Sequence, residues 1–298
     1  MATEVDSGVL RVGIGSRRAA IAGTAAASAI AVAVFAPILY YMFLHWGQVA
    51  DYSHGYLIAP LSAYFIWERR KVLARTPIEP SWLGLIPLAL GALALAVGRL
   101  GVELMSMRVA FVLTLIGIQV LMLGIAMSRV LAFPLCFLFL MVPLPQSLVN
   151  VIAFPLQLTA ADLAVNTLHL FGFPVLREGN ILILPQTRLF VHEACSGLRS
   201  LMALGTLGVL FAYFFRKSWL ERIVLVASTI PIAVVVNAFR VALTAVLTYA
   251  WGAQMAEGAI HQTEGFFTFA MAFALLMLEA TLVSMLIRAI SRRKQARA

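Results

Sequence analysis

The residues of this chain best suited to chemistry gather in the stretch VHEACSGLRSLMAL, which begins at Val191. Cys195, one of two cysteines, stands there between charged residues and an apolar segment. A thiol becomes a strong nucleophile once a neighbouring cation or base lowers its pKa. Arg240 in VVVNAFRVALTAV and His261 in EGAIHQTEGFF also stand in or beside apolar runs. Imidazole can take a thiol proton, and a guanidinium can hold a carboxylate or stabilise an oxyanion. This set could carry out nucleophilic acyl transfer.

Each of the three residues also has a structural interpretation. Cys195 could be a buried thiol, since cysteine is often buried. Arg240 could pair with a glutamate and hold helices together, and His261 could cap a helix at the membrane interface. The glutamates available for such a pair are Glu193, Glu257 and Glu264. A zinc site made of His192, Cys195 and His261 is disfavoured, because no two of them have the spacing of a known ligand motif. We expect neither a metal nor a cofactor.

The composition indicates which elements must position these residues. The chain is 62% hydrophobic and 12% charged, with a mean hydropathy of +0.96, whereas soluble domains are about 45–50% apolar and about 25% charged. Its apolar runs are long and unalternating, so we predict a helical integral membrane protein. The net charge of +9 fits cytoplasmic loops rich in Lys and Arg better than a nucleic-acid partner. Cys136, inside LAFPLCFLFLMV, is expected to be a buried structural thiol.

The hydropathy pattern predicts an all-α polytopic fold of about eight membrane-spanning helices. They form one membrane-embedded domain, residues 19–287, between a cytoplasmic segment at 1–18 and a basic cytoplasmic tail at 288–298. The expected spans are residues 19–44, 55–67, 82–100, 107–127, 130–146, 197–215, 223–250 and 264–287. Aromatic residues near their ends are typical of the membrane interface, and they include Trp46, Trp67, Trp82, Trp219 and Trp251.

Residues 147–172 are long enough to cross the membrane but carry a polar stripe of Asp162, Asn166 and His169. If this segment does not cross, 16 of the 22 Lys and Arg residues fall on one side, as the positive-inside rule favours. We therefore predict a helix in the outer interface. The following stretch, PVLREGNILILPQTRLFVHEAC, predicts a short β-hairpin-like loop on the outer side.

This threading brings the three reactive residues to one depth. Cys195 directly precedes a span, and His261 directly precedes the last one. Arg240 follows Arg222, on the cytoplasmic side, by about 27 Å of helix, which is close to the outer edge of an apolar core about 30 Å thick. Ionisable residues in a membrane are candidates for function because they are costly to bury.

At these residues the chain resembles the exosortase branch of the exosortase/archaeosortase family. EACSGLRSLMAL resembles the family's nucleophile motif, PIAVVVNAFRVALTAV its arginine motif and HQTEGFF its histidine motif. DYSHGYLIAPLSAYFIWERR resembles its N-terminal signature, and PLQLTAADLAVNTLHLFGFPVLREGNILILP resembles the segment that leads into the cysteine. The resemblance extends in order over about residues 50–270.

The resemblance implies a membrane-embedded cysteine protease and transpeptidase, with Cys195 as nucleophile, Arg240 as the family's arginine and His261 as base. The implied substrates are secreted proteins ending in a Pro-Glu-Pro motif, a transmembrane helix and basic residues, the PEP-CTERM signal. The implied site is the outer face of the inner membrane in Gram-negative-type bacteria, often alongside exopolysaccharide production. The acyl acceptor, water or a group such as a glycan or lipid-linked group, stays open.

Several other residues are candidates for supporting roles, either orienting a catalytic group or satisfying a buried partner. They are Arg199, Asn237, Glu193, Glu264 and His54, with Asp162 and Asn166 able to face the site from the interfacial helix and Glu279 expected to pair within the bundle. One alternative is an enzyme that transfers acyl or lipid groups through the same cysteine. Another is a non-enzymatic scaffold or transporter component for exopolysaccharide export, but transporters often carry inverted repeats and polar groups near the midplane. We expect membrane lipids as partners and no nucleic acid.

Overall fold

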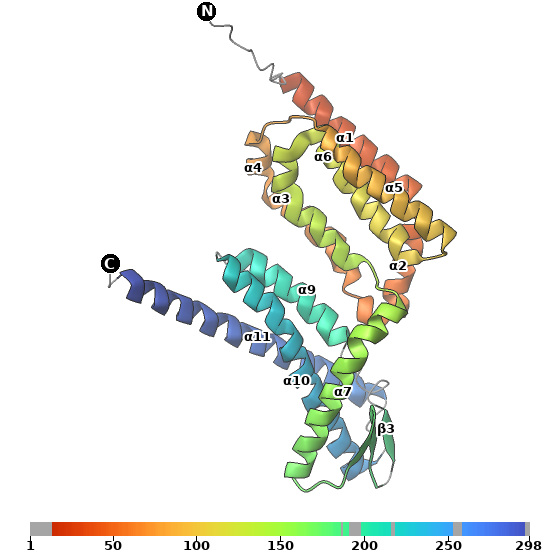
Figure 1. Cartoon of the computed structure of the whole chain (residues 1–298), viewed down its shortest axis with the longest axis vertical. Helices are drawn as coiled ribbons and strands as arrows, with labels where there is room; N and C mark the ends of the chain where they lie inside the picture. Colours follow the sequence, from red (N-terminus) through yellow and green to blue (C-terminus); the bar gives the residue numbers. More distant parts are fainter. Residues whose placement is uncertain (1–13, 186, 191–197, 216–217, 253–257, 296–298) are drawn as a thin grey trace, which may run out of the picture. The chain divides into compact units, whose positions relative to one another are not determined.

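The structure is a computed structural model that describes residues 14–185, 187–190, 198–215, 218–252 and 258–295. The chain divides into two compact units, Met1–Pro145 and Gln146–Ala298 (Figure 1), and each is built around its own buried side chains. The prediction of one membrane-embedded domain over residues 19–287 stays a prediction.

The first unit is helical throughout its described part. Its elements are α1 (Ile14–Val34), α2 (Ala36–Gln48), η1 (Ala50–Tyr52), α3 (Gly55–Glu68), α4 (Arg70–Arg75), η2 (Trp82–Gly84), α5 (Leu85–Leu100), α6 (Leu104–Phe137) and η3 (Leu138–Met141). The predicted first span, residues 19–44, is thus made of α1 and α2, with Phe35 between them and a proline in the first turn of α2.

Glycines let α5 and α6 pack closely. Gly84, Gly91 and Gly98 are seven residues apart, so they fall near one face of a helix with 3.6 residues per turn. A Cβ atom at Gly84 would lie 2.3 Å from the backbone nitrogen of Leu121, and one at Gly98 would lie 2.9 Å from the carbonyl oxygen of Glu103. Small residues let two helix backbones approach closely. This matters in a membrane, because apolar side chains gain little by moving from lipid, which is equally apolar, into a helix interface.

Gly124 divides α6 into two arms. Its φ of 83° and ψ of 177° lie in a region that glycine alone adopts readily. A Cβ atom there would lie 1.7 Å from the carbonyl oxygen of Glu79. The two arms correspond to the predicted spans 107–127 and 130–146, with the break at Gly124.

The second arm of α6 runs antiparallel to α3. Arg69 donates a hydrogen bond to the carbonyl oxygen of Val130 at 2.6 Å, and Ser62 donates one to that of Pro134 at 2.8 Å. Arg17, near the start of α1, donates to the carbonyl oxygens of Leu73 at 2.5 Å and Thr76 at 2.9 Å, at the end of α4. The basic clusters of this unit therefore share one end of it, as the threading requires.

In its described part, the second unit combines four helices with a small sheet. Its elements are α7 (Gln146–Leu170), β1 (Leu176–Glu178), β2 (Ile181–Ile183), β3 (Arg188–Phe190), α9 (Leu198–Phe215), α10 (Trp219–Trp251) and α11 (Gly258–Gln295). The strands pair antiparallel in the order β1–β2–β3, with Leu176 opposite Ile183 and Ile181 opposite Phe190. The expected β-hairpin-like loop is thus a three-stranded antiparallel sheet.

Two apolar clusters hold this unit together. One joins α7, the sheet and the last turns of α10, and includes Leu168, Leu182 and Val241. The other joins α9, α10 and α11, and includes Leu204 and Leu276. We call them the sheet cluster and the bundle cluster.

Among the described residues, six segments are long and apolar enough to cross a membrane, so the protein is a polytopic helical membrane protein. They are Arg17–Val34, Trp82–Leu100, Leu104–Met141, Gln146–Leu170, Trp219–Trp251 and Gly265–Met285. The predicted count of eight is not confirmed, because two predicted spans share Leu104–Met141, while α3 has 14 residues and the apolar part of α9 is only Leu201–Phe214. α7 is among the six, so its interfacial placement stays a prediction.

One expectation about burial is wrong. Cys136 is exposed rather than buried, and lipid tails, which are as apolar as leucine, can surround such a residue without loss. Trp46, near the end of α2, is 7% exposed, and its Nε1 donates to the carbonyl oxygen of Met141 at 3.0 Å, so it packs within the unit, and its place at the membrane interface stays a prediction. The other tryptophans are exposed near the ends of helices, as expected for interfacial residues: Trp67, Trp82, Trp219 and Trp251.

Candidate active site

The predicted nucleophile lies outside the described residues. Cys195 and Glu193 belong to residues 191–197, and the description resumes at Leu198, where α9 begins. For three other predicted residues the structure describes the helical backbone but not the side chain: Arg199 in α9, and His261 and Glu264 in α11.

The beginning of α9 lies level with Arg240. Helices α9 and α10 are neighbours that run in opposite directions (Figure 1). A Cβ atom at Gly208 of α9 would lie 2.6 Å from the methyl carbon of Thr229 of α10. Leu198 stands ten residues before Gly208 and Phe239 stands ten residues after Thr229, so equal helical rise brings the first turn of α9 to the level of Arg240.

The guanidinium of Arg240 lies against α11, one turn from His261. Ser228 donates a hydrogen bond to Glu279 at 2.9 Å, which confirms that Glu279 pairs within the bundle. Nearer the other end of α10, a Cβ atom at Gly265 would lie 3.5 Å from a terminal nitrogen of Arg240 and 3.8 Å from its Cζ. From the first contact to the second, the residue number rises along α10 and falls along α11, so the two helices are antiparallel. His261, four residues before Gly265, lies one turn further toward the same end.

Arg240 stands where the two apolar clusters meet. Val236 belongs to the bundle cluster and Val241 to the sheet cluster. The Nε atom of Arg240 is buried, although the side chain as a whole is only partly so. Asn237, three residues earlier, is 6% exposed, and the hydroxyl of Thr244 donates to the carbonyl oxygen of Arg240 at 2.9 Å. A cation with apolar surroundings acts more strongly on an anion than it does in water.

Measured along the axis of α10, the start of α9, Arg240 and the turn of α11 with His261 lie within about one helical turn of one another. A family model described as transmembrane exosortase (Exosortase_EpsH) matches residues 46–278, most of the chain. The chain belongs to the transmembrane exosortase family. No curated protein and no solved structure matches it. The matched range of this exosortase includes Cys195, Arg240 and His261.

The polar stripe of α7 does not face Arg240 in this exosortase. Asp162 forms an ion pair of 3.0 Å with Arg177 of β1, and an imidazole nitrogen of His169 lies 2.7 Å from the carbonyl oxygen of Val175. Asn166 is exposed. The opposite face of α7, which is rich in alanine, packs on α10 instead. The polar stripe therefore holds α7 against β1 and against the loop that leads from α7 into β1.

His54 belongs to a set of contacts that fasten one end of the first unit. Its Nε2 lies 3.3 Å from the carbonyl oxygen of Leu140, and Tyr52 donates to that of Leu144 at 3.3 Å. Gly55 leaves room for the indole ring of Trp46, which a Cβ atom would meet at 2.5 Å. Burial lowers the pKa of His54, and hydrogen bonds with the backbone of Leu140 and Asp51 oppose this shift. The YSHG stretch thus has a structural role, and a contact of His54 with the active site stays a prediction.

A buried arginine at this end was missed by the sequence analysis. Arg108, in the second turn of α6, is 4% exposed, and the carboxylate of Glu103 caps the same helix by accepting from the backbone nitrogens of Met105 at 2.8 Å and Ser106 at 2.6 Å. Burial would raise the pKa of Glu103, but the bonds from Ser106 and Met105 and the charge of Arg108 outweigh it and lower that pKa. The sequence did carry a signal for Arg108, which is a charged residue near the beginning of a long apolar run.

Within the described residues, no group of three His, Cys, Asp or Glu side chains could hold a metal ion. His192 and Cys195, two members of the disfavoured zinc set, lie outside those residues.

Proposed function

We propose that this exosortase is a cysteine protease and transpeptidase that removes a PEP-CTERM-type sorting signal from secreted proteins. The observation that supports it is the contact of Arg240 with the α11 backbone one turn from His261, level with the start of α9. Cys195 precedes α9 by three residues. A helix N-terminus and a nearby cation both favour the thiolate form of a cysteine.

The proposed substrate is a protein that ends in a Pro-Glu-Pro motif, one transmembrane helix and a few basic residues. A single membrane helix fixes the bond to be cleaved at one depth, just outside the apolar core. Arg240 lies about 27 Å along α10 from Arg222, which is close to the thickness of that core. Anchoring both partners in one membrane also raises their effective concentration.

In the proposed reaction, His261 takes the proton of Cys195, and the thiolate attacks the carbonyl carbon that follows the recognised motif. Arg240 stabilises the oxyanion or holds the glutamate of the motif. Collapse of the tetrahedral intermediate breaks the C–N bond, and the amine leaves with the proton from His261. The product is a thioester on Cys195 and a released C-terminal helix.

The second half of the proposed reaction restores the enzyme. An acceptor nucleophile, either water or an amine or hydroxyl group such as that of a glycan or lipid-linked molecule, attacks the thioester carbonyl. His261 takes the proton of the acceptor and returns it to the Cys195 sulfur. Asn237, Arg199, Glu193 and Glu264 are the proposed supporting residues.

The proposed location is the bacterial inner membrane, with both termini in the cytoplasm and the active site at the periplasmic face. Arg17 and the basic residues of α3 and α4 share one end of the first unit. In the second unit, α10 begins near Arg222 and the antiparallel α11 ends in the basic tail, so this basic end is opposite Arg240. The positive-inside rule supports this orientation.

The test is co-expression of the full chain with a secreted reporter that carries a Pro-Glu-Pro sorting tail. We expect the wild type to remove the tail and Cys195→Ser to remove none. Cys136→Ser is the matched control, because Cys136 is the other cysteine and is an exposed residue of the first unit. Mass spectrometry of the new C-terminus identifies the cleaved bond and any acceptor.

Other outcomes favour the alternatives. Equal processing by wild type and Cys195→Ser, or none by either with several motifs, contradicts the protease and favours a scaffold or transporter component for polysaccharide export. Labelling of Cys195 by an acyl donor without cleavage of the reporter favours an enzyme that transfers acyl groups.

A further inference from the structure

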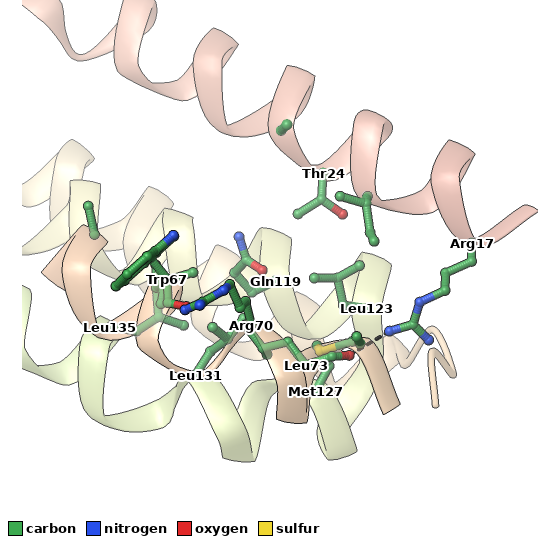
Figure 2. A pocket seen from close by; sticks show the side chains of 15 residues that line it. Arg17, Thr24, Trp67, Arg70, Leu73, Gln119, Leu123, Met127, Leu131 and Leu135 are labelled. Atoms are coloured by element: carbon green, nitrogen blue, oxygen red, sulfur yellow. Dashed lines mark hydrogen bonds between the residues drawn. The ribbon is translucent and has the colours of Figure 1, made fainter. Parts of the chain in front are cut away.

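The first unit contains an apolar groove of about 640 Å³ at the basic end described above (Figure 2). This volume is within the range of about 300–1,000 Å³ that is typical of small-molecule sites. Its floor is the row Met127, Leu131 and Leu135 on the second arm of α6, spaced by one helical turn, with Leu123 just before the break at Gly124. Helices α1, α3 and α4 form the rest of its wall.

Two arginines line this groove. Arg17 uses two terminal nitrogens to hold the carbonyl oxygens at the end of α4, and a guanidinium has five N–H donors. The Cζ of Arg70 lies 4.1 Å from the centre of the Trp67 ring, and one of its nitrogens donates to the carbonyl oxygen of Trp67 at 3.1 Å. Within the described residues, neither arginine forms an ion pair. Both charges are therefore available to an anion.

The occupant must combine a long apolar part with an anionic group. The transmembrane helix of a sorting signal does not fit, because its basic tail would face Arg17 and Arg70, and like charges repel. A phospholipid with a net negative headgroup satisfies both conditions, and basic pockets between membrane helices on the cytoplasmic side are typical sites for such lipids. We propose that this groove binds one anionic phospholipid, with its charged headgroup at the end lined by Arg17 and Arg70 and an acyl chain along the α6 row.

This assignment gives a partner to a polar side chain of the groove. Thr24 and Gln119 also line it. The hydroxyl of Thr24 donates to its own helix, to the carbonyl oxygen of Ala20 at 2.7 Å. The amide of Gln119 carries two N–H donors, which suit the ester carbonyl oxygens that follow the phosphate of a phospholipid.

The test is native mass spectrometry of the full chain from nanodiscs of phosphatidylcholine that contain a minor fraction of phosphatidylglycerol. We expect phosphatidylglycerol to stay bound in preference to phosphatidylcholine. Each of Arg17→Gln and Arg70→Gln should weaken that preference about fivefold, because one basic residue at an anionic headgroup contributes about that factor. Arg70 makes only local contacts in its own segment, so Arg70→Gln also tests the site if Arg17→Gln destabilises α4.

Two variants separate a site from general attraction to a basic surface. Lys71→Gln/Arg75→Gln removes two charges of α4 that do not line the groove, and we expect binding to stay unchanged. Ala63→Phe fills the groove and keeps both arginines, and we expect the bound lipid to be lost. Equal loss in the control, or full binding by Ala63→Phe, overturns the proposal, as does retention of inorganic phosphate in place of the lipid.

Discussion

The contact between Arg240 and Gly265 links two of the three proposed catalytic positions. The backbone of Gly265 is helical, so what limits the residue at this position is the space beside Arg240 rather than an unusual φ angle. Its missing side chain leaves a surface of α11 on which the guanidinium lies, one turn from His261. The position of the arginine therefore depends on the size of a residue that takes no part in the reaction.

Enlarging residue 265 should reduce catalysis without unfolding the protein. In Gly265→Leu the atoms beyond Cβ extend from a point that is already 3.5 Å from a terminal nitrogen of Arg240, so we expect them to displace the guanidinium. A misplacement of about 1 Å can reduce a rate about 10²-fold, so we expect a loss of that order in cleavage of the sorting reporter. The measurement is the cleavage rate in membranes, with the melting temperature of the purified protein measured in parallel.

Gly265→Ala is the control for this prediction. Its Cβ atom would meet the terminal nitrogen of Arg240 at 3.5 Å, an ordinary van der Waals distance, so activity should be retained. Full activity in Gly265→Leu at an unchanged melting temperature would show that the position of Arg240 does not matter for cleavage.

His54 should make the first unit less stable in weak acid. Its pKa lies below the ordinary value of 6.5 because of burial, so the unfolded chain binds the proton more readily than the folded one. The stability from this group is fully present above about pH 6.5 and is lost as the pH falls toward the pKa of the folded state. We expect the melting temperature to decrease between about pH 7 and about pH 5. His54→Gln, which keeps a donor for Leu140, should show a smaller decrease, and identical slopes would contradict this.

At the scale of elements, the reversal at Gly124 decides which helices of the first unit can meet. The first arm of α6 packs on α5 through glycines, and the second arm returns along α3. A continuous helix could not make both sets of contacts. The turn also brings the carbonyl oxygen of Glu79 onto Gly124, where no side chain fits.

Three glycine-to-alanine variants should separate the cost of the backbone conformation at Gly124 from the cost of its close contact with Glu79. Gly172 has a φ of +78° and open space around it, so Gly172→Ala should cost about 1–2 kcal/mol from the backbone alone. Gly124→Ala adds a collision with Glu79 and should destabilise the protein more. Gly205 is helical, with open space around it, and Gly205→Ala should be stabilising by about 0.5–1 kcal/mol. The measurement is thermal unfolding in detergent, and a Gly124→Ala variant as stable as Gly172→Ala would refute the packing argument.

The same elements show how far the sequence could predict the structure. Helical rise and the thickness of the bilayer suffice to bring Arg240 level with the ends of two neighbouring helices, and the contacts of α9 and α11 with α10 agree with that prediction. Hydropathy could not locate the turn at Gly124, because the residues on both sides of it are equally apolar. It also failed for Cys136, since apolar residues of a membrane protein can face lipid as readily as the core.

At the scale of the whole molecule, the orientation of the chain depends on α7. The basic residues of each unit gather at one end of that unit, but only the path of α7 determines whether the two ends face the same side of the membrane. For α7, hydropathy and the distribution of charge predict different paths. α7 is long and apolar enough to cross, whereas the distribution of Lys and Arg favours a helix that stays on the outer side.

Cysteine labelling can decide between these paths. Ser147 and Glu178 are exposed, at the start of α7 and in β1, so Ser147→Cys and Glu178→Cys in a background without Cys136 and Cys195 report the two sides of α7. We expect both to react with a membrane-impermeant maleimide added to the periplasm, because the positive-inside rule keeps them outside. Arg75→Cys, at the basic end, should react only after the inner membrane is permeabilised. If Glu178→Cys behaves like Arg75→Cys, α7 crosses the membrane, the sheet beside Arg240 faces the cytoplasm, and cleavage of a secreted substrate at that site becomes untenable.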